Sequence, residues 1–181
     1  SVRQILPGFK YELPPKQDKS NITECDIKTV VDQIKMRSGK RLSSAVLDTV
    51  EGASPLISRE IASFACGGDT AVDELTPIAL QRLEAKLGEI KEMLLGEGAE
   101  PTMLLRDGVK PYDFTFMDIT QYGFAVTPKR FGSFSELLDD FYYEKDRFER
   151  TRQRSQSLLK LLSNAAARAA RKLQSRQAEL D

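Results

Sequence analysis

The sequence predicts a mainly helical α+β fold that ends in one long helix, and three observations lead to this class. Residues 23–98 hold several amphipathic segments with helix start and stop signals. Residues 101–131 are rich in aromatic residues and contain a tight-turn signal, which predicts a small antiparallel sheet. Residues 133–181 contain neither Gly nor Pro. The 181 residues therefore suffice for a helical domain, a β element and an extended helix.

Residues 1–22 are predicted to be an extended linker that arrives from a further, N-terminal domain. Pro7-Gly8 and Pro14-Pro15 punctuate this segment and disfavour a helix.

Four helices are predicted between residues 23 and 98. Ser54-Pro55 and Thr76-Pro77 each have the form of an N-cap followed by Pro at the first helical position. Gly67-Gly68 and Gly96 are stop signals. The apolar residues expected to face the core are Ile27, Val30, Val31 and Ile34; Leu42, Val46, Leu47 and Val50; Leu56, Ile57, Ile61 and Phe64; and Leu80, Leu83, Leu87, Ile90 and Leu94.

Three short strands are expected in residues 101–131. Asp107-Gly108 is a hairpin signal between the apolar run 102–105 and the alternating segment 109–117. Pro111 restricts the second strand to an edge of the sheet, because Pro lacks the amide that a central strand needs. The aromatic segment 119–126 is predicted to be the third strand.

The final helix is predicted to begin with a capping box at Ser133 and Glu136 and to protrude as a basic arm. No Asp or Glu occurs from Arg150 to Ala178, so this stretch is expected to bind polyanions, although a solvated surface helix is the alternative. Its basic residues are Arg150, Arg152, Arg154, Lys160, Arg168, Arg171, Lys172 and Arg176.

An apolar seam runs along the same helix. Leu158, Leu162, Ala165 and Ala169 follow the spacing of a coiled-coil seam, and Leu173 and Leu180 continue it with one slipped step. Two interpretations are open: the arm dimerises through the seam, or residues 133–181 are the first helix of a coiled coil whose second helix lies beyond this sequence. The second interpretation is favoured, because the sequence ends within the periodic segment without a cap.

Composition excludes several kinds of chemistry. The chain has no His and only two cysteines, Cys25 and Cys66, so a Cys/His zinc site and a His-activated nucleophile are excluded. No catalytic residue, metal ligand or cofactor site is predicted, and we expect a protein that is not an enzyme. No segment has the apolar length of a membrane span, no signal-peptide core is present, and a cytoplasmic location without a membrane partner is expected.

Residues 51–55 join two predicted helices in the form of a helix-hairpin-helix. In such a motif the turn directs backbone amides at the N-terminus of the second helix, where a nucleic-acid phosphate can bind. A plain helical hairpin that only packs is the alternative, because Ser54 replaces the usual second Gly and Glu51 adds negative charge. The candidate nucleic-acid-binding residues are Gly52, Ala53, Ser54, Lys40, Arg41 and Arg59. A DNA glycosylase, which can carry a catalytic Lys in the hairpin and an Asp downstream, is a further alternative. This hairpin lacks a Lys, and Asp69 follows the Gly67-Gly68 break with nothing to activate.

Three segments together resemble the NFACT family of ribosome quality-control proteins, also known as fibronectin-binding protein A homologues. The first includes Pro7-Gly8, Tyr11, Pro14-Pro15, Gln17-Asp18-Lys19 and Asn21; the second Gly52, Ser54-Pro55 and Glu60-Ile61; the third Ser133-Phe134-Ser135-Glu136, Asp139, Phe141-Tyr142, Arg152-Gln153-Arg154, Leu158 and Asn164.

This resemblance implies a central, non-catalytic piece of a larger protein. Family members bind large ribosomal subunits that are obstructed by peptidyl-tRNA, recruit alanyl-tRNA and promote C-terminal tailing. The resemblance therefore implies rRNA, a ribosomal protein near the stalk base and tRNA as partners, with the basic arm (Arg150, Arg152, Arg154, Lys160, Arg168, Arg171 and Lys172) as the ribosome-contacting part. Two alternatives are a fibronectin- or fibrinogen-binding adhesin and a structural dimer formed through the seam.

Overall fold

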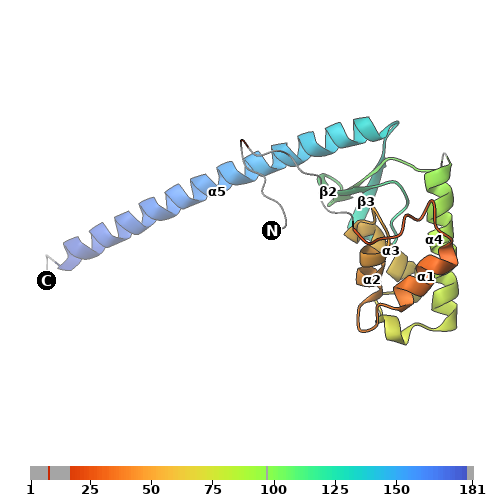
Figure 1. Ribbon diagram of the computed structural model, residues 1–181. Coiled ribbons are helices and arrows are strands. Elements are labelled where there is room, and N and C mark those ends of the chain that lie inside the picture. The colour runs from red at the N-terminus through yellow and green to blue at the C-terminus, as the bar shows by residue number, and fades with distance from the viewer. Residues whose placement is uncertain (1–7, 9–16, 97, 179–181) are drawn as a thin grey trace. The chain divides into compact units, whose positions relative to one another are not determined.

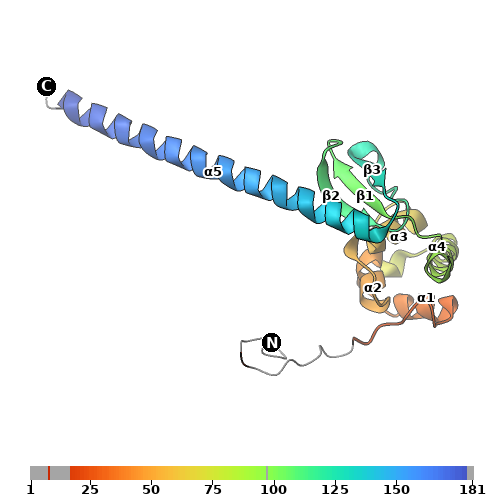
Figure 2. The same cartoon turned by 90° about the horizontal axis from the view of Figure 1, so that it is seen from above.

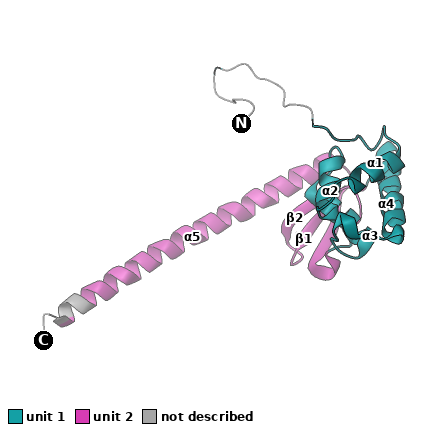
Figure 3. Ribbon diagram, turned by 60° about the horizontal axis from the view of Figure 1, so that its bottom comes forward, with its two compact units in different colours: residues 1–99, 119–121 teal, residues 100–118, 122–181 magenta. Residues whose placement is uncertain are grey.

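The computed structural model describes Gly8 and residues 17–96 and 98–178, and it divides into two compact units (Figure 3). Unit 1 comprises residues 1–99 with Ile119–Gln121, and unit 2 comprises Glu100–Asp118 with Tyr122–Asp181. The predicted class is confirmed, because the structure is mainly helical and has one small antiparallel sheet (Figure 1). Most of the predicted linker 1–22 and the seam residue Leu180 lie outside the described residues.

The described residues of unit 1 form four α-helices and a short 3-10 helix. The caps predicted from sequence are present: the Ser54 hydroxyl accepts from the Ile57 amide at 3.2 Å, and the Thr76 hydroxyl accepts from the Ala79 amide at 3.1 Å. Gly67 ends the third helix in the left-handed conformation with φ 72°. The elements are α1 (Ile27–Lys35), α2 (Leu42–Thr49), α3 (Pro55–Cys66), η1 (Val72–Glu74) and α4 (Pro77–Leu95).

The core of unit 1 lies among these helices. α1 packs against α2 and α4, and α3 packs against α2 and α4. Two residues expected in the core, Phe64 and Leu94, are instead 44% and 45% exposed. Lys86 lies buried on α4 with its ammonium group 5.1 Å from the Phe64 ring, so Phe64 serves as a cation–π partner at the margin of the core. The largest fully buried residues in this unit are Val30, Ile34, Leu42, Val46, Leu56, Glu60, Ile61, Leu83 and Leu87.

Unit 2 contains a three-stranded antiparallel sheet in the order β2-β1-β3. The strands are β1 (Thr102–Arg106), β2 (Lys110–Thr115) and β3 (Val126–Arg130). Asp107 and Gly108 form the predicted turn, with φ 52° and 70°. Pro111 lies on an edge strand, as expected, and the register shifts opposite it between Leu104 and Leu105.

The third strand begins later in the chain than the sequence predicts. Residues 119–121 belong to unit 1, a 3-10 helix η2 (Gly123–Ala125) follows, and the strand starts only at Val126. The Glu60 carboxylate accepts hydrogen bonds from the Thr120 amide and hydroxyl and from the Gln121 amide, at 3.0, 2.6 and 2.9 Å. These side-chain bonds replace the ladder that an aromatic segment would otherwise form, so the predicted strand over 119–126 was wrong.

A single long helix, α5 (Phe134–Ala178), completes unit 2. Ser133 caps it by accepting from the Glu136 amide at 3.2 Å, whereas Glu136 reaches back to the Gly132 amide and not to that of Ser133. Leu137 and Phe141 pack with Met103 on the sheet, and the Phe141 ring meets Phe114 edge-on. α5 starts beside the strands and continues past them (Figure 2), and every residue from Glu149 to Leu173 is exposed.

Candidate nucleic-acid interface

The basic residues of α5 fall mainly on one side of the helix. At about 100° per residue, Arg150, Arg154, Arg168 and Lys172 lie within about 40° of one another. Arg152 lies on the opposite side. We call the four aligned residues the basic stripe. It extends over roughly 33 Å at about 1.5 Å per residue.

The cations of α5 differ in position and in how far their charge is already paired within the protein. Lys160 and Arg171 lie on the adjoining face, which widens the positive surface. The Arg150 guanidinium pairs with Asp146 at 2.7 Å, so its charge is partly neutralised at the beginning of the stripe. The Arg168 Nε atom donates to the Asn164 carbonyl at 3.3 Å, which orients this side chain along the helix. Arg154 and Lys172 make no ion pair with any described residue and remain able to contact an external anion.

The apolar seam of α5 borders the basic stripe. Leu158, Leu162, Ala165, Ala169 and Leu173 lie within about 80° of one another, directly beside the stripe. All five are exposed in the structure. An exposed row of this length is typical of a surface that packs against another helix.

In the turn between α2 and α3, two backbone amides already donate hydrogen bonds within the protein. Gly52 adopts φ 73°, as expected for the glycine of a tight turn. The Glu51 amide donates to the Ser20 carbonyl at 2.9 Å, and the Ala53 amide donates to the Val50 carbonyl at 3.4 Å. The amides of Gly52 and Ser54 donate to no described group, so each is available to a phosphate.

The cations predicted to assist the turn are not gathered around it. Lys40 and Arg41 precede α2, about 12 Å from the turn at the other end of that helix. Arg41 donates to the Asp69 carbonyl, and Lys40 folds along α2 to pair with Asp48 at 2.6 Å. Arg59 is exposed on α3 and has an interaction of its own.

Asp69, the downstream Asp that the glycosylase alternative would need, has a structural role. Its carboxylate accepts from the amide and the hydroxyl of Ser43, at 2.9 and 2.7 Å. α2 has no N-cap side chain of its own, so Asp69 caps it from a distant part of the chain.

Two carboxyl groups of unit 1 titrate below their usual range. The hydrogen bond from Lys40 lowers the pKa of Asp48, and the charges of Lys40, Arg37 and Lys19 act in the same direction. The amide of Gly39, 2.7 Å away, lowers the pKa of Asp73, and a hydrogen bond with Ser38 adds to this effect. Both carboxylates hold together the segments that connect α1, α2 and η1.

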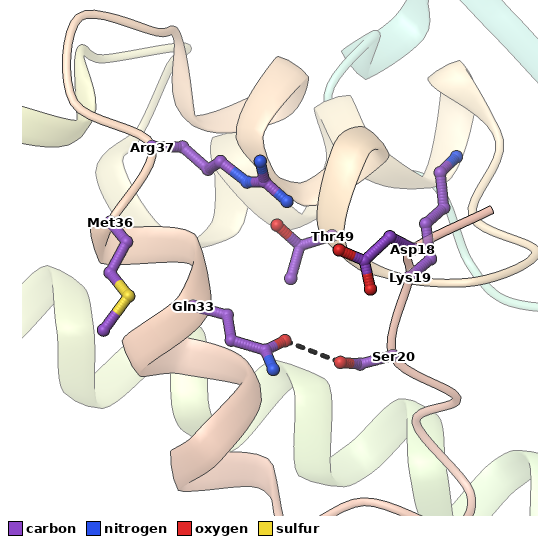
Figure 4. Close-up of a pocket in the computed structure, with 7 residues that line it drawn as sticks. All are labelled: Asp18, Lys19, Ser20, Gln33, Met36, Arg37 and Thr49. Atoms are coloured by element: carbon purple, nitrogen blue, oxygen red, sulfur yellow. Dashed lines mark hydrogen bonds between the residues drawn. The ribbon is translucent and has the colours of Figure 1, made fainter.

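A polar cavity of about 310 Å³ lies beside the end of α2 in unit 1 (Figure 4). This cavity is difficult to predict from sequence, because its lining comes from three separate segments. One signal was available: Thr49 takes the place of an apolar residue on the buried face that also holds Leu42, Ala45 and Val46. The cavity is lined by Asp18, Lys19, Ser20, Gln33, Met36, Arg37 and Thr49.

The part of the chain that the structure describes holds no group of His, Cys, Asp or Glu arranged to bind a metal ion. Cys25 and Cys66 are free and half-buried. Among the described helices, none combines the length and the apolar character required to cross a membrane.

Together these features define a helical unit and a small sheet that carries a long, exposed, basic helix. Comparison with known families matches residues 1–181 to the family described as NFACT N-terminal and middle domains. The chain belongs to this family, which confirms the resemblance inferred from its motifs.

A protein of Bacillus subtilis and a solved structure from Staphylococcus aureus are among the known proteins to which this chain is similar. The Rqc2 homolog RqcH of Bacillus subtilis (strain 168) is 30% identical over 181 residues, which are 100% of this chain and 29% of the relative. The crystal structure of the fibrinogen binding protein from Staphylococcus aureus is 28% identical, with a TM-score of 0.50 over 78% of this chain and 48% of that chain. This chain therefore spans less than half the length of either protein.

Proposed function

We propose that this chain is a non-catalytic RNA-binding part of a ribosome quality-control factor. The observation that carries the proposal is the basic stripe on α5, an exposed row of cations in a stretch without Asp or Glu. Membership of the NFACT family and similarity to an Rqc2 homolog support the ribosome as the setting. The expected partners are rRNA and ribosomal protein of an obstructed large subunit, together with tRNA.

Within this proposal, the two units have separate roles. The turn at Gly52 acts as a helix-hairpin-helix that receives a backbone phosphate on the amides of Gly52 and Ser54. α5 is the first helix of a coiled coil, and its seam packs against a second helix while the basic stripe stays open to RNA. Residues 1–22 link the helical domain 23–98 to a preceding domain. The chain positions RNA, and the ribosome performs the peptidyl transfer that adds alanine to the nascent chain.

The RNA-binding role of α5 can be tested with two matched charge reversals. Arg154→Glu changes the basic stripe, whereas Arg152→Glu makes the same change on the opposite side of the helix. We expect Arg154→Glu to weaken binding to a structured rRNA fragment about five- to tenfold and to reduce the slope of log affinity against log salt by about 1, because a phosphate contact is lost. Arg152→Glu should have little effect. Equal losses in both variants, or affinity that does not depend on salt, would contradict the proposal.

An adhesin is the second candidate, because the similar solved structure is named as a fibrinogen binding protein. Surface plasmon resonance with fibrinogen and fibronectin distinguishes the two candidates. We expect any binding to these proteins to be weak and to disappear in high salt, whereas a true adhesin site would retain its affinity.

The exposed seam also predicts association of the isolated chain. Sedimentation should detect a weak dimer, because the seam then packs against its own copy. The dimer should be lost when Leu162→Lys interrupts the seam.

A further inference from the structure

The cavity beside α2 is lined by a residue whose buried hydroxyl group has no partner among the described residues. Thr49 is 1% exposed, and among the described residues its Oγ1 atom is the buried side-chain polar atom that lacks a hydrogen bond. Protein interiors almost always satisfy such groups with protein, water or ligand. Figure 4 shows the Thr49 hydroxyl facing the same space as the side chains of Arg37, Gln33 and Asp18. The cavity therefore has an unused hydrogen-bonding atom in its wall.

The other side chains in the wall offer both donors and acceptors. The Ser20 hydroxyl donates to the Gln33 Oε1 atom at 2.6 Å. The side-chain amide nitrogen of Gln33 therefore remains available as a donor to a ligand. The Arg37 guanidinium makes no ion pair with a described residue and adds further donors. Asp18 supplies a carboxylate acceptor, whereas Lys19 points away from the space in Figure 4.

Donors from Arg37 and Gln33 beside an acceptor from Asp18 favour a neutral ligand. Such a ligand has two hydrogen-bond acceptors on one edge and two donors on the adjacent edge. A bare phosphate would meet the Asp18 carboxylate, and a cation would meet the Arg37 guanidinium. Guanine presents O6 and N7 to a guanidinium and N1–H and N2–H₂ to a carboxylate. Adenine lacks the paired donors. The volume of about 310 Å³ lies at the lower limit of ligand cavities, so it suits one base.

We propose that this cavity binds one unpaired guanine base of an RNA. Arg37 and Gln33 donate to the acceptor edge, Asp18 accepts from the donor edge, and the Thr49 hydroxyl gains the partner that it lacks. Met36, which is 81% exposed at the rim, provides a flexible apolar side chain that can cover the face of the base. The site lies in the segments that flank the α2–α3 turn, since Ser20 pairs with Thr49 and Glu51. The inference rests on the proposed RNA-binding function and specifies which base is read.

The test is an NMR titration of the ¹⁵N-labelled chain with guanosine monophosphate, adenosine monophosphate and inorganic phosphate. We expect guanosine monophosphate to shift the signals of Thr49, the Gln33 side-chain amide and Arg37, with at least tenfold higher affinity than adenosine monophosphate. Inorganic phosphate should leave these signals unchanged. Equal shifts with all three probes would overturn the proposal in favour of a simple anion site, and the absence of any shift would refute the guanine site.

Two variants sharpen the test. Asp18→Asn changes an exposed side chain, so the fold is retained, and it should weaken binding of guanosine monophosphate at least tenfold. Thr49→Val removes the hydroxyl at nearly constant volume and should also weaken binding, whereas Ser44→Ala, an exposed change on the same helix, should not. Unchanged affinity in Asp18→Asn would refute the base-reading geometry.

The same measurements separate this inference from the proposed function. Arg154→Glu should leave the binding of guanosine monophosphate unchanged while it weakens binding of the rRNA fragment. If the chain binds the rRNA fragment through α5 but the mononucleotide causes no shift at Thr49, only the guanine site fails. If neither probe binds, the RNA-binding function fails as well.

Discussion

Glu60 shows how a single buried residue determines the course of a distant segment. Its side chain is 1% exposed, and its carboxylate accepts three hydrogen bonds from Thr120 and Gln121. The Gln121 side chain returns a further bond to the Leu56 carbonyl at 3.0 Å. A carboxylate can remain inside a protein only when its lone pairs are satisfied in this way. Residues 119–121 are therefore held on unit 1 by polar contacts.

Glu60→Gln should lower the free energy of unfolding by about 2–3 kcal/mol, because the amide keeps one acceptor oxygen and turns a donor toward backbone amides. Urea unfolding followed by circular dichroism measures this loss. Glu92→Gln, an exposed change on α4, is the matched control and should remain within about 0.5 kcal/mol of the parent chain. A similar small change for both variants would mean that the Thr120 and Gln121 contacts contribute little to stability.

At the scale of elements, helix boundaries follow from local chemistry. Ser54 and Thr76 accept from amides three residues later, so the start of each helix depends on neighbours in the sequence and could be predicted. The start of β3 could not be predicted, since it depends on Glu60, which lies about sixty residues earlier. The aromatic pattern of residues 119–126 therefore cannot reveal that the Glu60 carboxylate binds this segment.

The candidate sites differ in the same way. The basic stripe is periodic within one helix, so residue spacing alone identifies its members and separates Arg152 from them. The cavity around Thr49 is assembled from a lead-in segment, α1 and α2. Its hydroxyl is notable only because no described group satisfies it, and sequence cannot show this. The separation of Lys40 and Arg41 from the hairpin turn, in contrast, follows from the length of α2, because these residues precede the helix and the turn follows it.

Gly52 in the turn and Gly88 in α4 should respond in opposite ways to substitution by Ala. A Cβ at Gly52 or at Gly88 would meet no atom within 4 Å, so space is equal at the two sites. Gly52 has φ 73°, which an L-residue adopts at a cost, whereas Gly88 lies inside α4. Gly52→Ala should reduce stability by about 1 kcal/mol, and Gly88→Ala should increase it by about 0.5–1 kcal/mol. Thermal unfolding measures both changes, and destabilisation by Gly88→Ala would show that α4 needs its glycine for another reason.

For the whole molecule, charge is balanced in sum but unevenly distributed. The 27 basic and 27 acidic residues give a formal net charge of zero, yet the stretch from Arg150 to Ala178 contains no acid. Binding of a polyanion therefore depends on where the cations lie along the chain and not on net charge. The absence of His removes the side chain that ordinarily changes charge between pH 5 and 8.

This composition predicts how stability depends on pH. The pKa values of Asp48 and Asp73 are lower in the folded chain than the ordinary value of 3.8, so folding favours their ionised forms. Their contribution is complete above the unfolded pKa and is lost as the pH falls through the lower, folded pKa. The free energy of unfolding should therefore be nearly constant from about pH 5.5 to 7.5 and decline below about pH 4. Urea unfolding across this range measures it. Asp73→Asn should reduce stability at neutral pH and make the acid-induced decline less steep, whereas a variant with the parent's full pH dependence would show that the Gly39 contact does not couple to folding.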